Sequence, residues 1–112
     1  MPVKFIQHGA AIDHVPTADL PAGSVVVLED LVAVTKRTIR AGEFGVLHVE
    51  GVFEFPKPTG SGKAIPLGKT VYWHPGTCEV RTSGNGGAKL LGKSVQETGD
   101  DDATIRIRLG AG

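Results

Sequence analysis

The stretch ATIRIRLG, residues 103–110, decides the fold class because apolar and charged side chains alternate along it. Successive side chains of a β-strand point to opposite faces of the sheet. Ile105, Ile107 and Leu109 therefore fall on one face, and the two arginines between them fall on the other. The sequence predicts a strand here whose apolar face lies in the core.

Other runs have the same character, being short, rich in β-branched or aromatic residues, and bounded by turn formers. In chain order they are SVVVLED, LVAVTKRT, FGVLHVEGVFEF, KTVYWH, CEVRT and KLLGKSVQ. The Pro75-Gly76 pair predicts a hairpin between KTVYWH and CEVRT. Gly51 predicts a bulge or a bend where another backbone approaches closely. No segment has a clean helical period, so we expect an all-β fold, a single small β-barrel or sandwich of short strands.

The beginning of the chain follows a different pattern. Its apolar residues are scattered between Gly9, Pro16 and Pro21 and have neither a helical nor a strand period. We expect an extended N-terminal arm over residues 1–22 and a single β domain over residues 23–112. Apolar side chains on such an arm need a partner surface to cover them. The candidate contact residues are Phe5, Ile6, Ile12 and Val15.

Size and charge exclude several classes of protein. A chain of 112 residues fits one domain. Twelve Lys and Arg balance twelve Asp and Glu, so no overall field attracts the chain to nucleic acid or to an acidic membrane. Basic residues prevail over the stretch 57–93, and Asp100, Asp101 and Asp102 follow it. We interpret both groups as solvated loops.

Cysteine content and the absence of long apolar segments predict the compartment. The single Cys78 excludes an internal disulfide and indicates a reducing environment. The N-terminal residues lack the apolar run of a secretory signal, and no segment approaches the ~20 apolar residues that span a membrane. The sequence predicts synthesis and retention in the cytosol, with no membrane partner.

A Gly68-Lys69-Thr70 sequence raises the question of a nucleotide site. A P-loop requires G-x-x-x-x-G-K-[ST], in which a glycine-rich turn and a following helix bind phosphate. Here Lys63 occupies the position of the first glycine, and the residues after Thr70 favour a strand. Spacing and context both fail, so we interpret Lys69 as a solvated residue at the entrance of a strand.

Other constellations for chemistry are equally weak. The four histidines, of which His74 could meet Cys78 across a turn, do not have a recognised metal-ligand spacing. No G-x-S-x-G nucleophile motif is present. Aromatic residues lie inside apolar runs, where core positions are expected, although Tyr72 and Trp73 must face opposite sides of a strand. We predict no catalytic residue, no metal and no cofactor, and nucleic-acid binding is not favoured.

Four stretches of the chain resemble a family of small proteins of tailed phages. They are FIQHGAAIDH, AGSVVVLEDLVAVTKRTIRAGEFGVLHVEGVFEFPK, IPLGKTVYW and LLGKSVQETGDDDATIRIRLG. The family has been labelled a predicted RecA/RadA-type recombinase and is now described as a capsid cement or decoration protein. This sequence departs from the family at Glu29-Asp30, where we expect a Gly-Asp turn.

The resemblance implies a function without enzymatic chemistry. It implies a decoration protein that binds the outer surface of the major capsid protein shell and stabilises the particle. It also implies a homo-oligomer, with a trimer preferred, located on the virion surface and in the host cytoplasm during assembly. The four arm residues become candidate contacts with the capsid or with another subunit. The alternative is a recombination-associated protein that binds single-stranded DNA.

Overall fold

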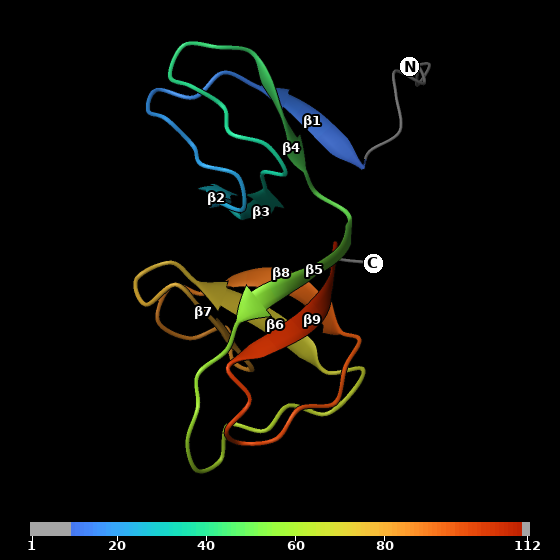
Figure 1. Cartoon of the computed structure of the whole chain (residues 1–112). Helices are drawn as coiled ribbons and strands as arrows, with labels where there is room; N and C mark the ends of the chain where they lie inside the picture. Colours follow the sequence, from blue (N-terminus) through green and yellow to red (C-terminus); the bar gives the residue numbers. More distant parts are fainter. Residues whose placement is uncertain (1–9, 111–112) are drawn as a thin grey trace, which may run out of the picture.

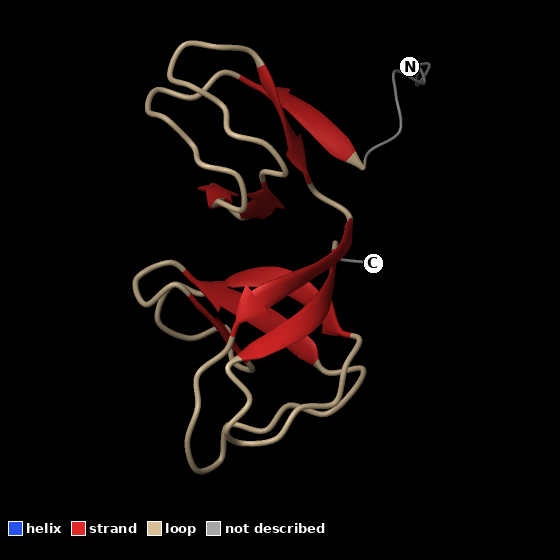
Figure 2. Cartoon of the chain, viewed as in Figure 1, coloured by secondary structure: helices blue, strands red, loops and turns tan. Residues whose placement is uncertain are grey.

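A computed structural model describes residues 10–110, and every regular element within that range is a β-strand (Figure 1). Figure 2 shows that long loops join the strands and that the strands form two layers. The strands are β1 (Ala11–His14), β2 (Val25–Leu28), β3 (Leu31–Val34), β4 (Gly45–His48), β5 (Gly51–Pro56), β6 (Thr70–His74), β7 (Glu79–Arg81), β8 (Lys89–Ser94) and β9 (Thr104–Leu109). The all-β prediction is confirmed.

The strands form two antiparallel sheets that pack on each other. The four-stranded sheet has the order β1-β4-β3-β2, and the five-stranded sheet has the order β5-β9-β8-β6-β7. The two edge strands of the five-stranded sheet, β5 and β7, approach each other without forming a ladder. This sheet is therefore strongly curled but not closed. Of the two architectures that the sequence left open, the sandwich fits and the closed barrel does not.

The five-stranded sheet has the alternation that the sequence predicts. Ile105, Ile107 and Leu109 are at most 2% exposed, whereas the arginines between them are exposed. The predicted hairpin is also present, because β6 and β7 pair with Trp73 opposite Val80. Trp73 is buried and packs against Phe55, with ring centroids 5.9 Å apart. One side of this sheet therefore forms the main core.

The β2–β3 hairpin connects the two cores. Val32 and Val34 belong to the cluster of the five-stranded sheet, whereas Ala33 between them packs with Ile39 and Leu47 on the other side. Both faces of β3 are thus buried, as expected for a strand between two layers. In Figure 1, β2 and β3 lie above the five-stranded sheet, and β1 and β4 lie farther from it.

Two glycines allow the chain to bend or to pack closely. Gly51 has a φ of 130° and stands where the chain passes from the four-stranded to the five-stranded sheet, so the predicted bend is present. The atoms nearest to a Cβ there belong to the ring of Phe53, not to another backbone. The close backbone approach is instead at Gly92, where a Cβ would lie 2.0 Å from the carbonyl oxygen of Arg108. Leu91 beside it forms a bulge against β6.

The described part of the predicted arm, residues 10–22, is hydrogen-bonded to the four-stranded sheet. Residues 11–14 form β1, which pairs with β4 from Ala11 opposite His48 to His14 opposite Gly45. Leu20 forms a bridge with Ile39. The division of the chain at residue 23 stays a prediction, but this part of the arm has partners within the chain.

The loops 57–69 and 95–103 hold each other at the end of the five-stranded sheet. The Lys57 side chain is buried, and its ammonium donates hydrogen bonds to the carbonyl oxygens of Pro58 (3.0 Å), Gly99 (3.0 Å) and Asp102 (3.2 Å). All three donors of the ammonium are thereby used. The interpretation of Lys57 as a solvated lysine is wrong, because these carbonyls replace water around the charge.

Candidate functional site

The backbone donors of the Gly68-Lys69-Thr70 turn are not available to a phosphate. The N–H of Gly68 donates to the carbonyl oxygen of Ser94 at 2.9 Å, and the N–H of Lys69 donates to Ser94 Oγ at 3.0 Å. Lys69 itself is exposed, and β6 begins at the next residue. The turn therefore connects two strands, as its failed spacing predicts.

The earlier glycine-rich turn, residues 60–63, already holds an anion from the chain itself. The carboxylate of Asp100 accepts hydrogen bonds from the N–H groups of Lys63 (3.0 Å) and Ala64 (2.9 Å). A turn with N–H groups directed at one point is an anion-binding arrangement. Here Asp100 fills it, so this acidic residue orders a loop and is more than a solvated charge.

His74 and Cys78, which could meet across a turn, each form hydrogen bonds within that turn. His74 Nδ1 faces the N–H and the hydroxyl of Thr77, each at 3.1 Å, and the Cys78 thiol donates to the carbonyl oxygen of Pro75. Within residues 10–110 no group of three or more His, Cys, Asp or Glu side chains could hold a metal ion. The hairpin turn uses both side chains for its own hydrogen bonds.

The outer end of the β1–β4 pair carries an apolar patch, which we define as Val15, Phe44 and Val46. Val15 directly follows the last residue of β1 and Phe44 directly precedes β4, so both lie at the same end of the pair. The side chains are 54%, 69% and 41% exposed, respectively. Exposed apolar side chains that adjoin one another are a candidate binding surface.

A groove of about 500 Å³ adjoins the apolar patch. Phe44, just before β4, and Val46 and His48 within it line one side, and Lys36 and Arg37 from the preceding loop also line the groove. Burial, followed by the nearby Lys36 ammonium, lowers the pKa of His48 below its ordinary value. The groove is therefore apolar along the strand, and at the loop it carries the two cations and the carboxylate of Glu43.

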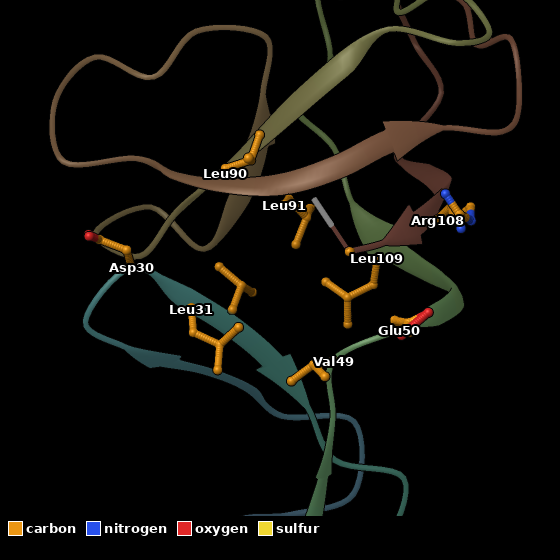
Figure 3. Close-up of a pocket in the computed structure, with 10 residues that line it drawn as sticks. Asp30, Leu31, Val49, Glu50, Leu90, Leu91, Arg108 and Leu109 are labelled. Carbon is orange, nitrogen blue, oxygen red and sulfur yellow. The ribbon is translucent and has the colours of Figure 1, made fainter. Parts of the chain in front are cut away.

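A second crevice, of about 390 Å³, opens where β3 and the β4–β5 turn meet β8 and β9 (Figure 3). Its walls are mainly leucine and valine side chains, among them Leu31 from β3 and Leu90 from β8. Asp30 lies at one end of the view, and Arg108 and Glu50 lie at the other. Asp30 forms an ion pair with Lys89 at 2.9 Å, which lowers the pKa of Asp30. The crevice lacks converging polar groups of the kind that orient a small-molecule substrate.

The candidate contact residues have different environments. Ile12 is half-buried and packs against the core of the four-stranded sheet, and Val15 is exposed in the apolar patch. Phe5 and Ile6 lie outside the described residues. Sequence reasoning missed Phe44, because its apolar run suggested a core position. The signal that could have found it is Gly42-Glu43 just before it, which indicates a turn at the surface.

These features define a helix-free β-sandwich whose described residues offer surfaces for another macromolecule, without a grouping of catalytic or metal-binding side chains. The comparison with family models agrees, because the model for the phage cement protein family matches residues 6–109. The chain belongs to the phage cement protein family. The family has a structural role on the phage capsid, which places the protein in the virion. Among curated proteins and solved structures, none matches the chain.

Within residues 10–110, the structure contains no helix that is long and apolar enough to cross a membrane.

Proposed function

We propose that the protein is a non-enzymatic decoration protein that binds the outer surface of the major capsid protein shell and stabilises the particle. The observation that carries this proposal is the family match over residues 6–109, which covers nearly all of the 112 residues. The turns that resemble phosphate-binding loops have their donors occupied by Ser94 and Asp100, which supports a role without nucleotide chemistry.

The apolar patch is the proposed contact surface. Its three side chains leave apolar area in water, and burial of such area is worth roughly 25 cal/mol per Å². Phe5 and Ile6, which precede β1 in the chain, are proposed to extend the same contact. Ile12 supports it indirectly, because its packing holds β1 against the four-stranded sheet.

The protein is proposed to act as a homo-oligomer, with a trimer preferred, which assembles in the host cytoplasm and then attaches to the capsid. Many identical contacts of modest strength then add up over the shell. Mass measurement of the protein in solution, and of its copy number on the particle, tests the oligomeric state. A monomer in both states contradicts this part of the proposal.

Attachment is tested with shells assembled from the major capsid protein of the same phage. The parent protein is expected to sediment with the shells to saturation, and mass spectrometry of purified, DNA-filled particles is expected to detect it. Phe44→Ser should weaken sedimentation without lowering the melting temperature, because Phe44 is mostly exposed. Leu67→Ser is the matched control, since Leu67 is 64% exposed in a distant loop. Equal binding by both variants removes the apolar patch as the contact surface.

A further inference from the structure

The outward face of the five-stranded sheet carries three cations on two adjacent strands. Lys93 on β8 lies directly opposite Arg108 on β9. Arg106 lies two residues before Arg108 and therefore on the same face. All three side chains are exposed. We define these three residues as the basic face.

This arrangement lowers the folding stability of the unbound protein, because like charges directly opposite on neighbouring strands destabilise a sheet. Within residues 10–110 the ion pairs are those of Arg81 with Glu79 and of Lys89 with Asp30. The basic face therefore has no carboxylate partner in the part of the chain that the structure describes.

A carboxylate on the neighbouring strand shares this face and forms a hydrogen bond with a hydroxyl. Glu54 lies opposite Arg106 in the β5–β9 ladder. Its Oε1 atom accepts a hydrogen bond from the Thr104 hydroxyl at 3.1 Å, and it forms no ion pair among the described residues. One carboxylate, without an ion pair, therefore stands against the three cations, and the basic face keeps an excess of positive charge.

Apolar side chains flank the cations. Val52 lies opposite Arg108 on the other neighbouring strand and is 58% exposed, and Leu90 on β8 is 42% exposed. Protein interfaces combine apolar contact area with arginine, which is enriched there relative to the rest of the surface. The face therefore has the composition of a protein contact.

We propose that the basic face docks on a carboxylate-rich surface of the capsid shell. This inference rests on the proposed function and adds the chemistry of the partner surface. Guanidinium groups bind carboxylates through paired hydrogen bonds, and an acidic partner relieves the repulsion between Lys93 and Arg108. Charge complementarity of this kind sets the register of docking and increases the rate of encounter.

A protein partner fits this face better than a nucleic acid does. Proteins that bind single strands stack the bases on exposed aromatic rings. Trp73 and Phe55 are buried in the core, and Tyr72 is half-buried beside the backbone of Gly84. Among the described residues, the strongly exposed aromatic ring is that of Phe44, which belongs to the other sheet. The basic face therefore offers cations without stacking partners.

The test variant is Arg108→Glu, which separates binding from folding. The new carboxylate lies opposite Lys93, so the melting temperature is expected to stay the same or to rise. Sedimentation with shells of the major capsid protein is expected to weaken by about tenfold or more, because a charge-assisted contact is lost and a repulsive one replaces it. Arg108→Gln should weaken it less, since it only removes the charge. Lys63→Glu, at an exposed residue in the loop 57–69, is the charge-matched control and should bind as the parent does.

The possible results distinguish this inference from the proposed function. If the parent protein sediments with shells and both Arg108 variants sediment equally well, the basic face is not the docking surface and the proposed function stands. If the parent does not sediment with shells, both proposals fail. Binding of a single-stranded DNA oligonucleotide by the parent, abolished by Arg108→Glu, assigns the face to nucleic acid and overturns the inference. Selective loss of shell binding by the Arg108 variants, at unchanged melting temperature, supports it.

Discussion

Gly92→Ala tests the packing of β8 against β9, on which the five-stranded sheet depends. A Cβ at this position would lie 2.0 Å from the carbonyl oxygen and 3.0 Å from the carbonyl carbon of Arg108. Both atoms belong to the backbone, so no side-chain rotation relieves the contact. The strands must separate locally by more than about 1 Å to restore an ordinary van der Waals distance.

The expected cost follows from two terms. Overpacking in a well-packed region costs about 1–3 kcal/mol. Separation of the strands also weakens the ladder where Gly92 pairs with Leu109 and Lys93 pairs with Arg108, and each lost hydrogen bond costs about 1 kcal/mol. We therefore expect a loss of about 3–5 kcal/mol, a large fraction of the roughly 5–15 kcal/mol by which small domains are stable.

Urea unfolding measures this loss, with the fluorescence of the buried Trp73 as the signal. The matched control is Gly42→Ala, where φ is 79° but no atom lies within 4 Å of the added Cβ. That variant should lose only the cost of a left-handed alanine, about 1 kcal/mol. If Gly92→Ala loses no more than Gly42→Ala, the close approach of β8 and β9 is not as we describe it.

Other predictions concern single residues in turns, in the groove and in the loops. Glu29→Gly should raise the free energy of unfolding by about 0.5–1 kcal/mol, because Glu29 has a φ of 55° that glycine adopts without strain; an unchanged urea midpoint contradicts this. Because burial and Lys36 lower the pKa of His48, the unfolded state binds the proton first as the pH falls below the ordinary value of 6.5. Stability from this source is complete well above that pH and is lost as the pH falls through the folded-state pKa. The urea midpoint should therefore fall as the pH is lowered from about 7.5, and His48→Gln should reduce the fall. Lys57→Met should cost about 2 kcal/mol, because carbonyl oxygens that accept from the ammonium are left unpaired; a midpoint equal to that of the parent excludes a stabilising role.

The sequence predicted those strands whose signal is contained in a short stretch of the chain. The alternation through Ile107 identifies β9, and the Pro75-Gly76 turn identifies the β6–β7 hairpin, because both signals lie within about ten residues. β1 was missed because its strand is only four residues long and its partner, β4, lies far away in the sequence. A four-residue strand whose two apolar residues are adjacent has no distinctive period.

The environments of Lys57, Phe44 and Gly92 could not be predicted because they depend on tertiary contacts. Lysine is ordinarily solvated, and only the meeting of two long loops supplies the carbonyls that bury Lys57. Phe44 belongs to an apolar run, which suggests a core position, but its side chain is exposed just before β4 begins. The same limit applies to the binding surfaces. The alternation showed that Arg106 and Arg108 share a face, whereas the repulsion from Lys93 depends on the register with β8.

The central claim, that the protein binds the capsid and strengthens it, is tested most directly by heating DNA-filled particles that lack the protein. Particles of a phage with the gene deleted are compared with complete particles, and a dye that binds DNA reports the temperature at which DNA is released. We expect release at a lower temperature from the deficient particles, and recovery of the original temperature when the purified protein is added back. Equal release temperatures, or no recovery although the added protein has saturated the particles, would contradict the claim.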